Sequence, residues 1–213
     1  MSSPSIYVVS AICGNFLYES GCNPQRHEGG TSFTDLTDVS QYGGYGLGQW
    51  TNKEYPAPRP PLTRRRDLVL WLRSNGYTDY SGDGECAYVL AENHWSVNYG
   101  PYQSLTEFLE SPSTDINELT YIWFRNWEGI NDGTEARRKE YANDAYDYIT
   151  RHALDPNITA WAYDVGSIPW ADSLNNCVMV YRFYVGYVPP TPPTPTESIR
   201  KMPVWMMIRP ALY

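Results

Sequence analysis

The chain has 213 residues, with 16 basic against 24 acidic side chains and a formal net charge of −8 at pH 7. This length fits one domain of ordinary size with an appendage. The acidic balance argues against nucleic acid as a partner, because that partner needs a basic surface. No run approaches the roughly 18 apolar residues of a membrane span. The start "MSSPSIYVVSAIC" has neither a charged leader nor a clear cleavage site, so we expect synthesis in a cytoplasm.

Cysteine and histidine are too scattered for a disulfide framework or a metal centre. The chain has four cysteines, and no two of them form a C-x-x-C pair: they are Cys13, Cys22, Cys86 and Cys177. The histidines stand far apart in the chain: His27, His94 and His152. Because a zinc site needs clustered ligands, we predict no metal and no cofactor. We interpret the cysteines as buried packing side chains and leave open whether any of them pair.

The first predicted element is a helix with Ser3 as its cap and Pro4 at its first position. Apolar side chains recur along it at helical spacing, from Ile6 to Phe16. The next position of that face is an acid, Glu19, and Gly21 then ends the helix. An acid on the apolar side of a last helical turn needs an explanation.

Residues 25–44 read as a polar loop, and the glycine-rich "GGYGLGQWT" follows at 43–51. Further helices are predicted at about 62–75, at 84–95, in "SLTEFLES", in "STDINELTYIWFRNWEG" and at 134–153. The three arginines of residues 64–66 are interpreted as a solvated first turn, with a binding patch as the alternative. The predicted class is mostly α, with an α+β character.

The residue pattern of the sequence changes after residue 153. Residues 154–188 contain "CVMVYRFYVGYV", a β-branched and aromatic run typical of a strand, so we predict an extension there with a possible β hairpin. Residues 189–196 are a Pro-rich linker. The last segment, 197–213, is basic, aromatic and rich in methionine, and we interpret it as a docking tail.

Glu19 has a chemical interpretation that follows from its position. The last turn of a helix carries unpaired carbonyls and a partial negative charge, which disfavours a carboxylate. Burial beside Phe16 acts in the same direction. Both effects favour the protonated acid, which can donate a proton to a leaving group.

Three segments in order resemble the phage tail lysozyme family, peptidoglycan hydrolases with a goose-type lysozyme and lytic transglycosylase fold. The first is "GNFLYESGCNP", which matches a family helix at Gly14-Asn15, Glu19-Ser20 and Asn23-Pro24. The second is "GYGLGQWT", which matches at Gly44, Gly46-Leu47 and Gln49-Trp50-Thr51. The third is "WFRNWEGINDGTEARRKEYANDAY", with matches at Phe124, Trp127, Glu128, Arg137 or Arg138, Ala142 and Tyr146. The resemblance covers about residues 5–153 and implies a catalytic domain over 1–153.

The resemblance implies a site in which Glu19 protonates the leaving oxygen of a β-1,4 glycosidic bond. Residues expected to bind substrate are Ser20, Tyr45, Gly46, Gln49, Trp50 and Tyr141, with Gly46 acting through its backbone. The alternatives are a structural role for Trp50 and capping of the helix end by Ser20. Candidates for a second carboxylate are Asp38, Asp35 and Glu28. Glu128 is expected to fix the cleft by hydrogen bonding. Gly48 replaces a larger residue of many relatives, which we expect to open the cleft or to change how sugars are held.

Two questions stay open at this stage. An inverting or retaining muramidase needs a second carboxylate, whereas the transglycosylases of this fold use one glutamate for both steps and let the muramyl 6-hydroxyl attack. The setting is also open. We favour a virion enzyme of the phage tail, made in the host cytoplasm, that opens the cell wall during entry and contacts other tail proteins through 197–213. The alternatives are a lysis-phase endolysin and a catalytically idle structural protein of the tail.

Overall fold

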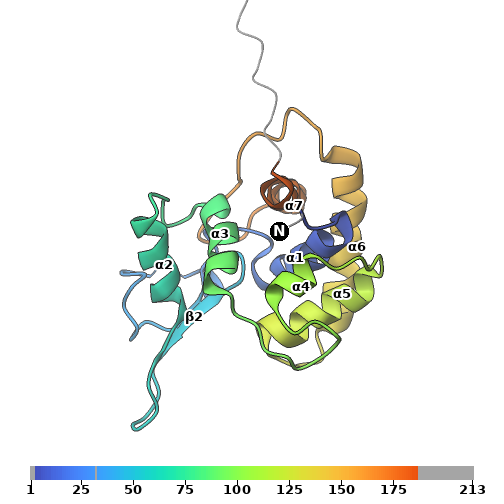
Figure 1. Ribbon diagram of the computed structural model, residues 1–213. Helices are drawn as coiled ribbons and strands as arrows, with labels where there is room; N and C mark the ends of the chain where they lie inside the picture. Colours follow the sequence, from blue (N-terminus) through green and yellow to red (C-terminus); the bar gives the residue numbers. More distant parts are fainter. Residues whose placement is uncertain (1–2, 32, 187–213) are drawn as a thin grey trace, which may run out of the picture.

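The computed structural model describes residues 3–31 and 33–186. This part of the chain forms a helical body beside a smaller lobe that contains the sheet (Figure 1). The helices are α1 Ile6–Ser20, α2 Arg64–Ser74, α3 Gly82–Glu92, α4 Leu105–Leu109, α5 Ile116–Trp123, α6 Glu135–His152 and α7 Trp170–Val185. A short 3₁₀ turn, η1 (Glu28–Gly30), and a π-helical turn, η2 (Phe124–Glu128), complete the set. The predicted class, mostly α with a minor sheet, is confirmed.

Helix α1 is the centre of the helical body. It packs against α5, α6 and α7, and apolar side chains on all its sides are buried. The contact with α6 is especially close at Gly14, where an added Cβ would lie 2.5 Å from the Cβ of Ala142. A glycine at this point therefore fixes the spacing between α1 and α6.

The ends of α1 show why the sequence forms this helix. The hydroxyl of Ser5 accepts a hydrogen bond from the backbone N–H of Val8, so the helix begins after Ser5 and not at the predicted cap, Ser3. The predicted end is confirmed. Gly21 adopts the left-handed conformation at φ 67° and donates its N–H to the carbonyl of Leu17.

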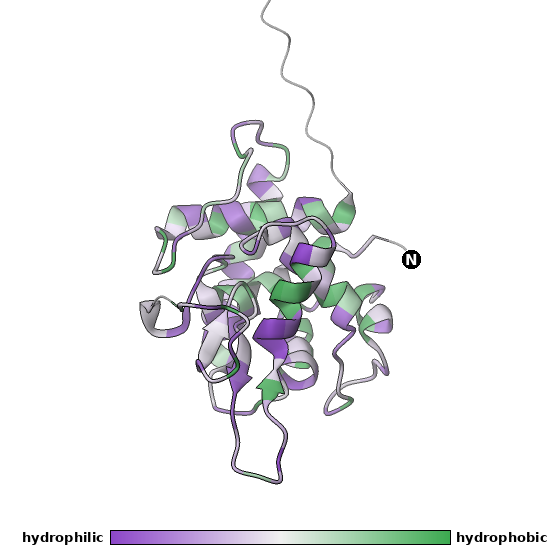
Figure 2. Ribbon diagram, turned by 90° about the vertical axis from the view of Figure 1, so that its left-hand side faces the viewer, coloured by the Kyte–Doolittle hydropathy of each residue, from purple (hydrophilic) through white to green (hydrophobic). Residues whose placement is uncertain are grey.

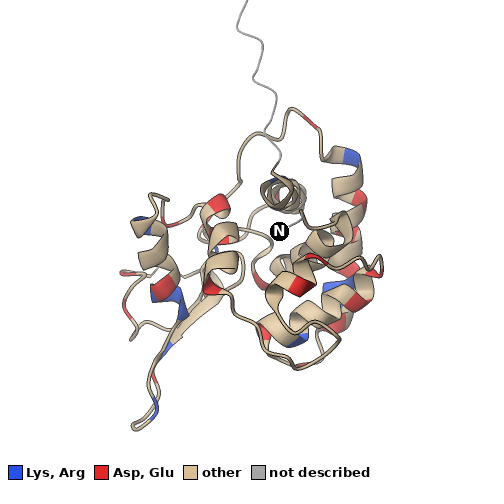
Figure 3. Cartoon of the chain, in the orientation of Figure 1, with Lys and Arg blue, Asp and Glu red and all other residues tan. Residues whose placement is uncertain are grey.

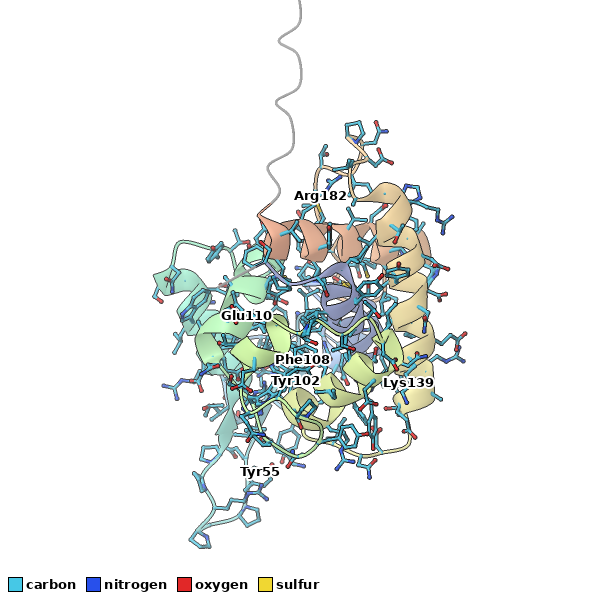
Figure 4. All side chains as sticks on the ribbon, turned by 45° about the vertical axis from the view of Figure 1, so that its right-hand side comes forward. Tyr55, Tyr102, Phe108, Glu110, Lys139 and Arg182 are labelled. Atoms are coloured by element: carbon cyan, nitrogen blue, oxygen red, sulfur yellow. The ribbon has the colours of Figure 1, made fainter. Side chains whose placement is uncertain are left out.

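The smaller lobe contains an antiparallel sheet in the order β1 (Gly43–Tyr45), β2 (Trp50–Lys53) and β3 (Leu62–Thr63). Tyr45 pairs with Trp50, so the glycine-rich motif forms the turn of a hairpin. The segment between β2 and β3 projects from the molecule as a largely hydrophilic arm (Figures 1 and 2). Tyr55 lies on this arm, away from the helical body (Figure 4).

The β extension predicted within 154–188 is wrong for residues 170–185, which form α7. The buried side chains Cys177, Val180 and Tyr184 recur at helical spacing and join the same core as α1. Packing on this preformed face overrides the strand preference of β-branched residues. Arg182 strengthens the attachment by donating hydrogen bonds to the carbonyls of Ala153, Asp155 and Ile158. Figure 4 shows Arg182 on this helix.

The predicted domain boundary near residue 153 stays a prediction. The segments 189–196 and 197–213, expected to be a linker and a docking tail, lie outside the described residues. All four cysteines are buried and free, which confirms their interpretation as packing side chains. Within the described part of the chain, no helix is long and apolar enough to cross a membrane.

Candidate active site

A cavity of about 590 Å³ lies where the helical body meets the sheet lobe. Its walls come from the end of α1, from η1, from the β1–β2 turn, from the start of α2 and from η2. The lining residues are Tyr18, Glu19, Glu28, Gly48, Gln49, Thr51, Leu62, Arg64, Glu128 and Ile130. Segments from all three family-like motifs or their neighbours therefore meet at one cavity.

Glu19 lies in the wall of this cavity with 19% of its side chain exposed. Its carboxylate accepts a short hydrogen bond from the Nη2 of Arg138 on α6. Glu19 was expected among apolar groups, and the structure instead shows it paired with this buried cation.

Arg138 is held rigidly at the back of the site. Its side chain is 1% exposed, and it donates hydrogen bonds to the amide oxygen of Asn15 (3.1 Å) and to the hydroxyl of Thr134 (3.0 Å). The ring of Tyr18 lies 4.3 Å from its guanidinium carbon. Of the two arginines that matched the family motif, Arg138 is the one at the site, whereas Arg137 is exposed and pairs with Glu140.

Glu128 is the second carboxyl group at this cation. It is the last residue of η2, directly before Gly129 at φ 70°, and its side chain is 8% exposed. Its Oε1 lies 3.9 Å from the Nη1 of Arg138 and finds no hydrogen-bond partner among the described residues. Burial, followed by the negative charge of Glu19, raises the pKa of Glu128 to about 8. Among the described residues, Oε1 of Glu128 therefore does not make the hydrogen bond that was expected to fix the cleft.

The glycine-rich turn contributes Gln49 and Gly48 to the cavity wall. Gln49 takes the left-handed conformation (φ 47°), and its Nε2 donates to the carbonyls of Gly46 (2.9 Å) and Arg26 (3.2 Å). At Gly48 an added Cβ would lie 2.5 Å from the ring of Trp127. The missing side chain of Gly48 lets the indole of Trp127 pack against the turn, and the expected effect of Gly48 on the cleft stays a prediction.

Five residues expected to bind substrate do not line this cavity: Ser20, Tyr45, Gly46, Trp50 and Tyr141. Tyr45 and Trp50 are buried, and their polar tips bond to the carbonyl of Asp79 (2.7 Å) and the carboxylate of Glu92 (3.1 Å). Their role in the structure is packing behind the site.

The other three of these residues also have structural partners. Ser20 donates a hydrogen bond to the carbonyl of Leu47 (2.9 Å), which joins the end of α1 to the glycine-rich turn. Gly46 lies against the carboxyl of Glu85. Tyr141 packs on the ring of Trp170.

Of the three candidates for a second carboxylate, only Glu28 lines the cavity. It accepts a hydrogen bond from the backbone N–H of Gly44 at 2.7 Å. Asp35 and Asp38 instead close turns by accepting hydrogen bonds from Thr37 and Ser40. Hydrogen bonds to the charged form lower the pKa of both aspartates: those from Thr37 act on Asp35, and those from the side chain of Gln41 and then from Ser40 act on Asp38.

Sequence reasoning missed the arginines and acids that support the site. Arg65 is fully buried and donates to five carbonyls of the loop between Leu36 and Gly43. The interpretation as a solvated first turn is therefore wrong for Arg65, whereas Arg66 is exposed. Arg64 lines the cavity and forms a two-bond pair with Glu92. In Figure 3, basic positions mark the start of α2, and acidic positions occur on both lobes.

Glu85 of α3 is the other group that the sequence did not reveal. It is fully buried, and its Oε2 accepts the backbone N–H of Leu47 at 2.6 Å. Burial raises the pKa of Glu85 well above its usual range. An acid in the first turn of a helix is usually solvated, so nothing in the sequence indicated that Glu85 would hold the glycine-rich turn.

Comparison with known proteins shows the family of this chain. The model of the phage tail lysozyme family matches residues 5–149, which is more than half of the chain. The chain belongs to the phage tail lysozyme family, whose members are lysozyme-like peptidoglycan hydrolases. A search of curated proteins finds no significant match. Membership implies peptidoglycan as the substrate and a tail-associated location at the cell wall.

Proposed function

We propose that this protein is a virion enzyme of a phage tail that cleaves the β-1,4 bond between N-acetylmuramic acid and N-acetylglucosamine, with Glu19 as an essential carboxyl group. The observation that carries the proposal is the position of Glu19 in the wall of a 590 Å³ cavity, against a buried guanidinium. A cavity of this size accommodates a few sugar rings. Glycosidases need carboxyl groups at such a cleft to move protons at the scissile oxygen.

Two observations support this setting: the family of the chain and the sequence of residues 189–213. The Pro-rich segment 189–196 and the tail 197–213 are proposed to attach the enzyme to other tail proteins. Local cleavage of the wall during entry would then be its role. A lysis-phase enzyme is the second setting, since the same catalytic domain serves both.

Digestion of purified peptidoglycan, followed by mass spectrometry of the soluble fragments, tests the reaction. Fragments that end in reducible muramic acid identify a muramidase. Fragments one water lighter, with anhydro-muramic ends, identify a transglycosylase. Fragments cut only within the stem peptides, or no fragments from any wall chemotype, contradict the proposed function.

The setting has a separate test. We expect the protein in purified phage particles, detected by mass spectrometry of virions after a high-salt wash. Its presence in lysates and absence from washed particles would favour the lysis-phase alternative.

A further inference from the structure

The arm between β2 and β3, residues 54–61, begins and ends beside the cavity. Thr51 of β2 and Leu62 of β3 line the cavity, and the arm extends outward from these two strands (Figures 1 and 2). Its sequence is "EYPAPRPP", with four prolines among the last six positions. Because proline fixes φ, a segment of this composition is semi-rigid. The arm therefore continues one wall of the cavity outward.

Tyr55 holds two cations on this arm. The guanidinium carbon of Arg59 lies 3.7 Å from the centre of the Tyr55 ring, and the Nζ of Lys53 lies 5.5 Å from it. Both distances are within the range of cation–π contacts. Among the described residues, neither cation forms an ion pair with a carboxylate, in contrast to Arg64 and Arg138 in the cavity wall and behind it. Both are exposed, so their charges are available to an anionic partner.

The charge of this region is opposite to that of the whole chain. Residues 53–66 carry five basic side chains and one acid, Glu54, in a protein with a net charge of −8. The basic residues are Lys53, Arg59, Arg64, Arg65 and Arg66. Figure 3 shows basic positions along the arm and at the start of α2. The acids of the cavity wall, Glu19, Glu28 and Glu128, disfavour an anion inside the cavity, so anionic groups of a bound polymer are better placed on the arm.

We propose that the arm binds the peptidoglycan strand outside the cavity, through ion pairs of Lys53 and Arg59 with carboxylates of the stem peptides. This inference rests on the proposed function and names a part of the substrate that the cavity does not contact. Stem peptides project from the glycan at its muramic acids and end in free carboxylates. Guanidinium and ammonium groups bind carboxylates by charge-assisted hydrogen bonds. The arm adds affinity for the polymeric wall and takes no part in bond cleavage.

A second cluster of the same composition offers a matched control. The cations of Arg125 and Lys139 lie 5.8 Å and 5.0 Å from the ring centre of Tyr121. This cluster belongs to the helical body, and none of its three residues lines the cavity. Figure 4 shows Tyr55 on the arm and Lys139 on the helical body. Loss of the two cations at Tyr121 changes the net charge by the same amount as loss of the two cations of the arm.

The test measures binding of the full chain to insoluble sacculi from which teichoic acids have been removed with hydrofluoric acid. Every protein carries Glu19→Gln, so that the wall stays intact during the measurement. We expect Lys53→Gln combined with Arg59→Gln to raise the dissociation constant about 3- to 20-fold at low salt, as the loss of two exposed ion pairs does. The difference should shrink at about 0.5 M salt. Arg125→Gln combined with Lys139→Gln should bind as the parent does, with all variants folded by circular dichroism.

Chemical blocking of the wall identifies the anion. Conversion of the wall carboxyls to neutral amides, with a carbodiimide and ethanolamine, should make the arm variant and its parent bind equally. A difference that persists on amidated sacculi, or that requires teichoic acid, overturns the proposal, as does an equal loss of binding in the control pair. Failure of wild type to cleave any glycan would instead overturn the proposed function, whereas the binding comparison decides on the arm alone.

Discussion

Arg138 of α6 donates a hydrogen bond to Glu19 at the end of α1, across 119 positions of the sequence. The contact depends on the close packing of α1 and α6 at Gly14 and on the anchoring of the guanidinium by Asn15 and Thr134. The first and third family-like motifs are therefore joined by one ion pair.

Replacement of Arg138 tests the pair directly. Arg138→Lys keeps the charge but loses the planar fork that bonds Asn15, Thr134 and Glu19 together. We expect at least a 10-fold loss in the rate of peptidoglycan solubilisation. The loss of stability should be about 3 kcal/mol or more for Arg138→Ala, because buried partners lose their cation. Arg137→Lys, at an exposed position, is the control and should change neither quantity.

The α1–α6 spacing gives the second prediction. A methyl group at residue 14 would meet Ala142 and the carbonyl of Arg138 at 2.5 Å and 2.6 Å. Gly14→Ala should therefore destabilise the fold by about 1–3 kcal/mol, as overpacking does. The displaced helices should also reduce activity at temperatures where the variant is folded. Chemical denaturation and initial rates measure both effects, and a variant as stable and active as wild type would contradict the close packing.

The pH dependence of stability reports on Glu128. Its pKa of about 8 in the folded protein is above the ordinary value of about 4.3 for a glutamate in an unfolded chain. Between these values the folded state binds more protons, so this group lowers the free energy of unfolding as pH rises from about 4.5 to 8, by up to about 1.4 kcal/mol per pH unit.

Denaturant titrations of wild type and Glu128→Gln at several pH values measure this contribution. The difference between the two proteins isolates Glu128 from Glu85, whose pKa is also raised by burial. We expect Glu128→Gln to gain in relative stability as pH rises to about 8 and to stay constant above it. Parallel curves would mean that Glu128 titrates normally.

Much of this site follows from local sequence, and the rest depends on packing. The stop at Gly21 and the position of Glu19 one residue before the last of α1 follow from helical spacing and left-handed glycine. The partnership with Arg138 does not follow from local sequence, because no local pattern predicts which residue of a distant helix faces Glu19. The helix α7 shows the same limit, since a β-branched run becomes helical when one of its faces completes the core.

The support of the glycine-rich turn gives a further prediction. Glu85→Gln retains an acceptor for the N–H of Leu47 and mimics the protonated acid that burial favours, so it should leave folding and activity near wild type. Glu85→Ala leaves that N–H without this acceptor and opens space beside Gly46. We expect a loss of about 1–3 kcal/mol in stability, with a lower rate. Equal stabilities of the two variants would show that the hydrogen bond to Leu47 contributes little.

The most direct test of the central claim is the rate of peptidoglycan solubilisation by Glu19→Gln beside Glu140→Gln. Glutamine keeps the size of Glu19 but can neither gain nor lose a proton in the reaction. We predict that Glu19→Gln is folded and at least 10²-fold slower than wild type, while Glu140→Gln retains the wild-type rate. Activity of Glu19→Gln equal to that of the control would contradict the assignment of this cavity as a glycosidase site.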